Sequence, residues 1–213
     1  MTGSKTSHFL LYNCYMTNRD EALKKIRDEL LAFKESPLYT YRTENHFFPV
    51  VGEGNHEAQI MFVGEAPGLN EAKTARPFCG AAGKFLDELI NSIGLERAQV
   101  YITNIVKDRP PENRDPTPEE IELYAPFLDR QINIIQPRVI ATLGRHSMNY
   151  IMKKFGLDLE LEPISRIHGR TFAAQTSYGE ITIVTLYHPA AALYNGGMRD
   201  TLKQDFQILK KFV

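Results

Sequence analysis

The sequence predicts an α/β protein with three layers, in which helices cover both faces of a central, mainly parallel sheet of four strands. Two observations indicate this fold class. Short apolar runs alternate with amphipathic helical segments along the chain, an order typical of a parallel sheet layered by helices. The runs are apolar throughout, as expected for strands buried on both faces. The length of 213 residues suffices for one full core, so we expect a single domain over residues 1–213.

The composition excludes several classes of protein. No run approaches the ~18 apolar residues of a membrane span, and the N-terminus lacks the pattern of a signal peptide. We therefore expect a cytoplasmic, monomeric protein without membrane association. The net charge of −1 argues against coating of nucleic acid by bulk electrostatics, yet a few local basic residues can still bind phosphates. Cys14 and Cys79 are far apart and lack C-x-x-C partners, which predicts two free thiols and no cysteine metal site.

The N-terminal half supplies two helices and two strands of the predicted fold. Apolar residues recur near helical spacing over residues 19–35, which predicts an amphipathic helix that covers the core. The apolar run 58–64 ends in glycine and predicts the first core strand. A helix over 81–93 ends at Gly94, a helix stop signal. The next apolar run, 100–106, predicts the second strand.

The C-terminal half continues the same alternation. A threonine, a proline and a glutamate in the segment that starts at residue 117 form the N-cap, first-turn proline and capping-box acid of a helix. Residues 137–144 predict a third strand, followed by a helix to about 155. Residues 180–189 predict a fourth strand, and a last helix covers about 199–212. No internal repeat interrupts this order.

Three segments that follow predicted strands carry candidate functional residues. In parallel sheets the functional loops leave the carboxyl ends of the strands. The glycine-rich segment 64–83 lacks the spacing of a phosphate-binding loop, and by itself it fits a structural turn equally well. Asn104 offers a donor and an acceptor that could read a base edge, or it caps a turn. His188 could donate a hydrogen bond to an oxygen that gains negative charge, or it is structural.

Five ordered blocks resemble the family-four uracil-DNA glycosylases. The blocks are GEAPG, RPFCGAAGKFLDELI, VYITNIVKDRPPENRDPTPEEIELYAPFLDRQI, PRVIATLG and YHPAAAL. The resemblance runs from about residue 30 to the C-terminus. It implies a uracil-DNA glycosylase-like fold and an enzyme that removes uracil from DNA and leaves an abasic site. The implied partner is DNA that contains uracil.

The resemblance also implies roles for individual residues. The first block would form the wall of the uracil pocket, and it consists of Glu65, Ala66, Pro67 and Gly68. Glu71 would be the nearest acid that positions or activates water, and Phe78 would stack on the extruded base. Asn104 would read the uracil edge and reject cytosine, while His188 would hydrogen-bond the uracil oxygen as the leaving group becomes an anion.

The chain departs from the family at its metal cluster. Members typically bind a [4Fe-4S] cluster through four cysteines. The corresponding positions in this sequence are Phe33, Ser36, Asp108 and Tyr124. We therefore expect no iron-sulfur cluster, no other cofactor and no metal. We expect instead direct packing of Phe33 and Tyr124, with a polar contact from Asp108.

Candidate DNA contacts lie outside the predicted base pocket. The segment ALYNGG contains Leu193 and Tyr194 and could wedge into a duplex. Arginines that could contact phosphates, or could equally be solvated surface charges, are Arg109, Arg114, Arg145, Arg166 and Arg170. His168 could approach the same face. Two alternatives stay open, namely a catalytically silent DNA-binding module and a glycosylase for another deaminated base such as hypoxanthine or xanthine.

Overall fold

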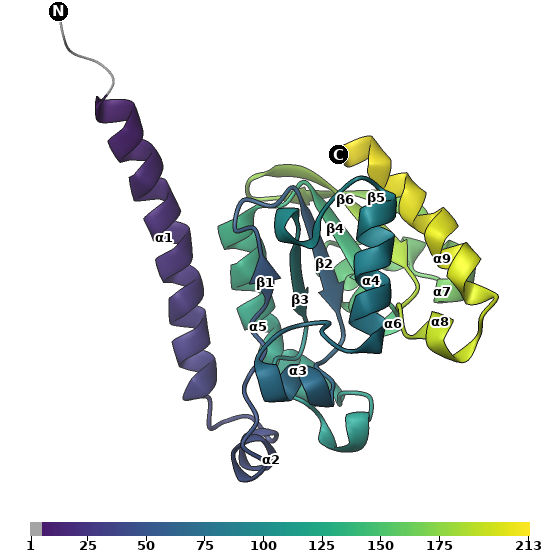
Figure 1. Cartoon of the computed structure of the whole chain (residues 1–213), viewed down its shortest axis with the longest axis horizontal. Helices are drawn as coiled ribbons and strands as arrows, with labels where there is room; N and C mark the ends of the chain where they lie inside the picture. The colour runs from purple at the N-terminus through teal and green to yellow at the C-terminus, as the bar shows by residue number, and fades with distance from the viewer. Residues whose placement is uncertain (1–5) are drawn as a thin grey trace, which may run out of the picture.

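The computed structural model confirms the three-layer α/β/α fold (Figure 1). It describes the backbone of residues 6–213 and the side chains from residue 18 onward. The strand order is β1-β3-β2-β4-β6-β5. The four predicted strands form the parallel centre of this sheet, and they are β3 (Tyr101–Asn104), β2 (Ile60–Gly64), β4 (Val139–Leu143) and β6 (Gly179–Leu186).

Two antiparallel edge strands extend the predicted four-stranded sheet to six strands. They are β1 (Glu53–Gly54) beside β3 and β5 (Arg170–Thr176) beside β6. Neither strand has the continuous apolar pattern of a buried strand, since β5 is largely exposed and β1 has only two residues. Pairing with a neighbouring strand, rather than burial, therefore defines both edges.

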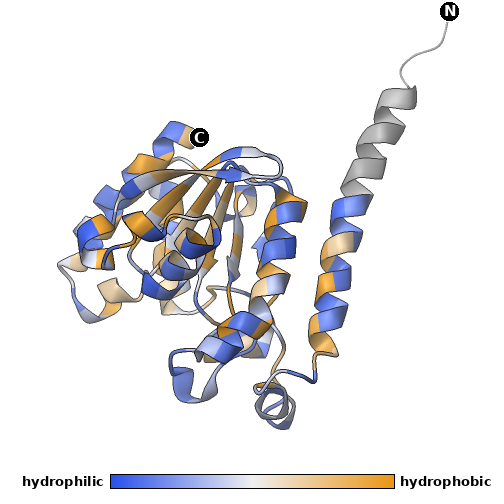
Figure 2. Cartoon of the chain, turned by 180° about the vertical axis from the view of Figure 1, so that it is seen from behind, coloured by the Kyte–Doolittle hydropathy of each residue, from blue (hydrophilic) through white to orange (hydrophobic). Residues whose placement is uncertain are grey.

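The core lies in two layers, one on each face of the sheet. Alternate β2 side chains point to opposite faces, so that Met61 and Val63 belong to one layer and Ile60 and Phe62 to the other. The first layer is covered by α1 (Thr6–Leu31), α5 (Pro118–Ile135) and α6 (Arg145–Lys154), and the second by α4 (Ala81–Ser92) and α9 (Met198–Phe206). Figure 2 shows the apolar central strands between helices whose other faces are hydrophilic.

The predicted helix bounds hold except at three ends. The helix predicted over 19–35 begins earlier, at Thr6, and ends at Leu31. It ends there because the buried Arg42 guanidinium donates to the main-chain oxygens of Leu30 (2.7 Å) and Leu31 (2.9 Å) and so caps the helix. The helix predicted over 199–212 is α-helical to Phe206 and continues as a 3₁₀ helix, η4 (Gln207–Phe212).

The strand register brings the functional loops to one edge of the sheet. Gly64 pairs with Asn104 at the ends of β2 and β3, and Leu143 pairs with Leu186 at the ends of β4 and β6. Since β3 and β4 flank β2 on opposite sides, a crevice forms at this switch point, as in other open α/β sheets.

The short helices are α2 (Tyr39–Glu44), α3 (Leu69–Thr74), α7 (Ile164–Ile167), α8 (Ala191–Tyr194), η1 (Arg97–Gln99), η2 (Pro111–Asn113) and η3 (Asp158–Glu160). Over residues 6–213, no helix is long and apolar enough to cross a membrane.

Candidate active site

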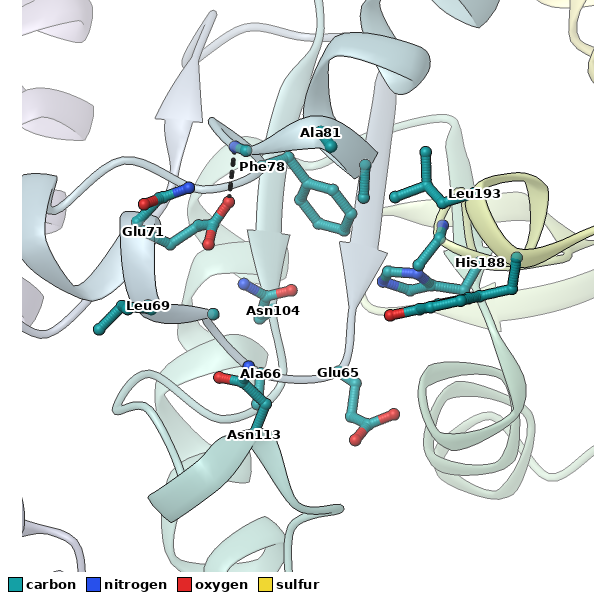
Figure 3. Close-up of a pocket in the computed structure, with 16 residues that line it drawn as sticks. Glu65, Ala66, Leu69, Glu71, Phe78, Ala81, Asn104, Asn113, His188 and Leu193 are labelled. Atoms are coloured by element: carbon teal, nitrogen blue, oxygen red, sulfur yellow. Dashed lines mark hydrogen bonds between the residues drawn. The ribbon is translucent and has the colours of Figure 1, made fainter.

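A cavity of about 490 Å³ opens at the carboxyl edge of the sheet, a size usual for ligand sites. It brings together most of the residues singled out in the sequence, which are Glu65, Ala66, Gly68, Glu71, Phe78, Asn104, His188, Leu193 and Tyr194. Figure 3 shows Phe78, Asn104 and His188 around a common space, with the Glu65 carboxylate pointing away from it. Segments that are far apart in the chain thus form one pocket.

Three of the predicted site residues lie outside the lining. Pro67 is buried within its loop. The Arg109 guanidinium donates to Tyr41 Oη (2.8 Å) and to Asn113 Oδ1 (2.7 Å), and Arg114 donates two hydrogen bonds to Glu120. Their DNA contacts stay predictions, as do those of the exposed Arg145, Arg166 and Arg170.

The pocket also contains residues that the sequence analysis did not single out. They are Leu69, Asn70, Gly80, Ala81, Ala82, Asn113 and Ala190. Asn113 is notable because both it and Glu112 adopt positive φ angles of 56°. An asparagine tolerates this left-handed conformation better than most residues. The proline-bracketed segment that contains it was the sequence signal for such a turn.

Asn104 presents an unsatisfied acceptor at the pocket. Its side chain is 1% exposed, and Oδ1 is one of two buried side-chain polar atoms in the described part of the chain without a hydrogen-bond partner. Such orphaned atoms are costly. A Cβ on Gly64 would lie 2.3 Å from Asn104 Oδ1 and 2.7 Å from Phe78 Cζ. Glycine at position 64 therefore allows both side chains to approach the end of β2.

Phe78 is held in a strained backbone conformation. Its φ of 48° lies in the left-handed region, which costs free energy for a residue with a side chain. The Arg97 guanidinium donates to the main-chain oxygens of Pro77 and Phe78 and holds the turn. A Cβ on Gly83 would lie 1.8 Å from Phe78 O, so the turn also needs glycine there. The ring is thereby fixed as a flat, buried wall.

Glu71 connects α3 to the same turn. Its Oε1 accepts hydrogen bonds from the main-chain N–H groups of Cys79 and Gly80, both at 2.9 Å. Figure 3 draws one of these two bonds. Its Oε2 lies over Gly68, where a Cβ would come within 2.7 Å of it. One carboxylate oxygen therefore holds the Phe78 turn, and the other lies against the pocket-lining Gly68.

His188 is held as a neutral imidazole with a defined tautomer. Its Nδ1 accepts a hydrogen bond from the Ala190 N–H (3.1 Å), so in the neutral ring the proton is on Nε2. Burial lowers the pKa of His188 to about 4, against the opposing effect of the Glu71 charge. The centroids of the His188 and Phe78 rings are 5.5 Å apart, and the two ring planes are inclined by 31°. His188 Nε2 is therefore available as a hydrogen-bond donor at neutral pH.

A small acidic group borders the pocket. Ligand atoms of Glu65, Asp115 and His146 lie within 4.8 Å of one another, which is close enough to contact one cation. Asp115 is already paired with Arg145, and burial raises the pKa of Glu65, against the opposing charge of His146. Existing ion pairs thus compete for these carboxylates, and the expectation of no metal stays a prediction.

The four positions at which the resemblance implies cluster cysteines lie together, with Ser36, Asp108 and Tyr124 buried and Phe33 half-buried. Tyr124 Oη donates to Asp108 Oδ2 (2.6 Å) and lies 2.7 Å from Ser36 Oγ. The centroids of the Phe33 and Tyr124 rings are 5.5 Å apart, and the ring planes are inclined by 80°. The Arg42 guanidinium forms an ion pair with the Asp108 carboxylate at 3.2 Å. The predicted packing and polar contact are therefore confirmed. An iron-sulfur cluster needs thiolates, so hydroxyls and a paired carboxylate do not fit it.

The pocket suits a flat, polar heterocycle. Phe78 offers a ring face for stacking, Asn104 offers an amide edge that both donates and accepts, and His188 offers a single N–H donor. Such a combination can hold a base outside a duplex and stabilise negative charge that develops on one of its oxygens.

Comparison with known proteins agrees with this geometry. Residues 51–210 match the model of the "Uracil DNA glycosylase superfamily". The chain is 48% identical over 192 residues to a type-4 uracil-DNA glycosylase of Sulfurisphaera tokodaii, covering 90% of this chain and 84% of the relative. It is 43% identical to the type-4 enzyme of Archaeoglobus fulgidus, covering 88% and 91%. For the type-4 enzyme of Thermotoga maritima the identity is 36%, covering 93% and 98%.

Proposed function

The chain belongs to the uracil DNA glycosylase superfamily, and on this basis we propose that its pocket binds a uracil extruded from DNA and hydrolyses the N-glycosidic bond. A stacked base is out of reach of a protein pocket, so the nucleotide must leave the helix first. The products are free uracil and an abasic site.

The observation that carries the proposal is the orphaned Asn104 Oδ1. Uracil presents an N3–H donor beside the O4 acceptor, and the amide of Asn104 matches this pair with Oδ1 and Nδ2. Cytosine presents the reverse pair, an N3 acceptor beside an N4 donor, and would leave the buried amide unsatisfied. A site that loses such hydrogen bonds rejects the wrong ligand strongly. Asn104 is therefore the residue that selects uracil.

Bond cleavage then depends on the leaving group. The C1′–N1 bond breaks with its electron pair going to N1, while the sugar gains oxocarbenium character. Negative charge spreads to the uracil oxygens, and the His188 Nε2–H donates to one of them. A neutral donor of this kind needs no proton transfer to stabilise the anion. Phe78 keeps the ring planar and excludes water from its face.

Glu71 completes the reaction on the sugar side. Its Oε2 lies over Gly68 at the pocket wall, and it would position the attacking water and accept its proton as the water oxygen bonds to C1′. This assignment is supported by the position of the carboxylate next to the Phe78 turn.

The proposal includes three finer points. The enzyme acts without an iron-sulfur cluster, because its buried Ser36–Asp108–Tyr124 group offers no thiolate. Purified protein should contain no stoichiometric iron, and a broad visible absorbance with bound iron would contradict this. It acts as a monomer, to be checked by light scattering, and in the cytoplasm, to be checked by cell fractionation.

Cleavage of defined oligonucleotides tests the function. Matched strands that carry U, T, hypoxanthine or xanthine are incubated with the protein and abasic sites are cut with alkali. Uracil strands should be cut. The variants Asn104→Ala and His188→Ala should each lose ~10²-fold or more in rate. Asn91→Ala and His46→Ala, at exposed positions, serve as matched controls.

The outcomes separate the alternatives. No cleavage of any strand, with retained DNA binding, would indicate a silent binding module. Preferred cleavage at hypoxanthine or xanthine would indicate a glycosylase for another base. Wild-type rates in both pocket variants would refute the assigned site.

A further inference from the structure

Lys107 is a buried amino group to which the chemistry above assigns no role. Its side chain is 0% exposed. It extends back along the end of β3, and its Nζ donates to the main-chain oxygen of Asn104 at 2.6 Å. It therefore contacts the main chain of the residue whose side chain reads the base.

The other contacts of Lys107 are neutral acceptors. Nζ lies 2.7 Å from Thr103 Oγ1 and 2.6 Å from Gln131 Oε1. Among the described residues, no carboxylate lies within salt-bridge distance of it, and the adjacent Asp108 is paired with Arg42. Any charge on Lys107 is thus not cancelled by a contacting acid.

The hydrogen-bond pattern indicates the charged form. The Thr103 hydroxyl donates to Val51 O (2.7 Å), so its oxygen acts as an acceptor toward Lys107. The Gln131 amide nitrogen donates to Val51 O (2.8 Å) and Tyr101 Oη (3.1 Å), which leaves Gln131 Oε1 facing Nζ as an acceptor. With Asn104 O and the more distant Val51 O (3.4 Å), four acceptors surround Nζ. An ammonium has three N–H donors for them, whereas a neutral amine has two.

Desolvation acts in the opposite direction. Burial lowers the pKa of Lys107 well below its ordinary value. A buried ammonium without a contacting anion is costly, and negative charge that develops nearby reduces this cost because Coulomb interactions are strong in a medium of low polarity. In the proposed reaction the departing base carries such a charge and contacts the side chain of the same Asn104.

We propose that Lys107 is a positioning residue for excision: its ammonium group fixes the main chain of Asn104 and supplies positive charge beside the pocket that favours departure of uracil as an anion. This inference rests on the proposed function. Lys107 acts through Asn104 and does not contact the base. Its contribution should grow with the amount of charge that the leaving group must accommodate.

A leaving-group comparison tests the inference. Single-turnover rates and substrate KM are measured for Lys107→Met on strands that carry uracil or 5-fluorouracil, whose anion is intrinsically more stable. The uracil rate should fall ~10-fold or more, and the 5-fluorouracil rate several-fold less, with smaller changes in KM. Gln131→Leu is the matched control. It disturbs the same hydrogen bonds but keeps the amino group, and should slow both substrates by one common factor.

Each outcome bears on a different statement. If the wild-type protein cuts neither strand, the proposed function fails. If it cuts both and Lys107→Met slows both equally or not at all, only the role of Lys107 is overturned. Where Lys107→Met does not fold, the ultraviolet spectrum of free uracil bound to wild-type protein is titrated with pH. Bound uracil should ionise at lower pH than uracil in solution, and unchanged ionisation would overturn the inference.

Discussion

His188 illustrates how a single hydrogen bond defines a residue's chemistry. The N–H of Ala190 occupies Nδ1, so the ring cannot accept a second proton without losing this bond. Burial acts in the same direction on its pKa. The proposed reaction needs the Nε2–H of His188 as a donor. The main-chain N–H of Ala190, two residues further along, fixes this proton on Nε2, and no neighbouring acid is needed.

The first prediction concerns the pH dependence that follows from this. Because the pKa of His188 is about 4, single-turnover rates should show no inflection near pH 6.5 that depends on His188. In the unfolded chain the pKa of this histidine is ~6.5. The free energy of unfolding that the neutral ring contributes is therefore complete above pH 6.5, and it is lost as the pH falls toward 4. Rates and thermal midpoints from pH 4.5 to 8 check both statements. Glu65→Gln is the control, because burial raises the pKa of Glu65 and this carboxyl could itself cause an inflection. An inflection near pH 6.5 that persists in Glu65→Gln would contradict the low pKa of His188.

Gly64 carries the second prediction at this scale. In Gly64→Ala the new Cβ would lie 2.3 Å from Asn104 Oδ1, which must displace the amide that we propose reads the base. Misplacement of this size costs roughly 10²-fold in rate. Gly196→Ala, where a Cβ meets nothing within 4 Å, should retain the wild-type rate on single-stranded uracil DNA, which needs no wedge. Full activity in Gly64→Ala would show that Asn104 does not need its observed position.

At the scale of elements, α3 and the Phe78 turn act as one unit because Glu71 links them. The third prediction separates the two roles of this carboxylate. Glu71→Gln keeps an acceptor for the Cys79 and Gly80 N–H groups but loses the charge. It should therefore lower kcat with little change in KM, whereas Glu71→Ala should also raise KM because the turn loosens. Steady-state kinetics on uracil strands measure both constants, and identical behaviour of the two variants would contradict the division.

The buried group around Tyr124 is the second joint between elements. It connects α5 to the segment after β3 and, through Arg42, to the end of α1. Burial raises the pKa of Asp108, while the Tyr124 hydrogen bond and the Arg42 charge oppose this. The side chains of both ion-pair partners are at most 5% exposed, so neither charge can turn to water when the other is lost.

The fourth prediction follows from this burial. Asp108→Asn should lower the free energy of unfolding by about 3 kcal/mol, because it leaves the Arg42 charge buried without its partner. Tyr124→Phe removes one hydroxyl and should cost about 1 kcal/mol. Urea denaturation measures both values. Added iron and sulfide should stabilise neither variant, and an unchanged midpoint in Asp108→Asn would show that the ion pair does not support the fold.

At the scale of the whole molecule, an exposed apolar tip lies at the mouth of the pocket. Leu193 and Tyr194 line the pocket mouth and are 44% and 91% exposed. Large apolar side chains at such a position are suited to enter a base stack. The single-domain organisation stays a prediction for the whole chain.

The fifth prediction tests this wedge. Replacing Leu193 and Tyr194 together by alanine should slow excision from duplex DNA more than from single strands, because a single strand needs no unpairing before the base is extruded. Cleavage of the same uracil strand alone and annealed gives the ratio. Leu159→Ala, at a 99% exposed leucine outside the pocket lining, is the control. An equal loss on both substrates would exclude the wedge.

Most of the fold could be predicted from the sequence because its signals are local. Apolar runs, a capping box and glycine stops specify strands and helix ends through interactions within a few residues, and Thr117 and Glu120 form the predicted capping box. The edge strands β1 and β5 carried no such signal, since they exist only by pairing with β3 and β6.

The sequence by itself determined which residue types stand at the strand ends, and its resemblance to a family suggested the roles of Asn104, Phe78 and His188. Only the tertiary structure decided the features that depend on contacts between distant segments. These are the inclusion of Asn113 in the pocket, the two tasks of Glu71, the protonation state of His188 and the burial of Lys107 against Asn104. The physical reason is that burial, hydrogen-bond partners and pKa shifts arise from packing across the sheet, and no periodicity in the chain encodes them.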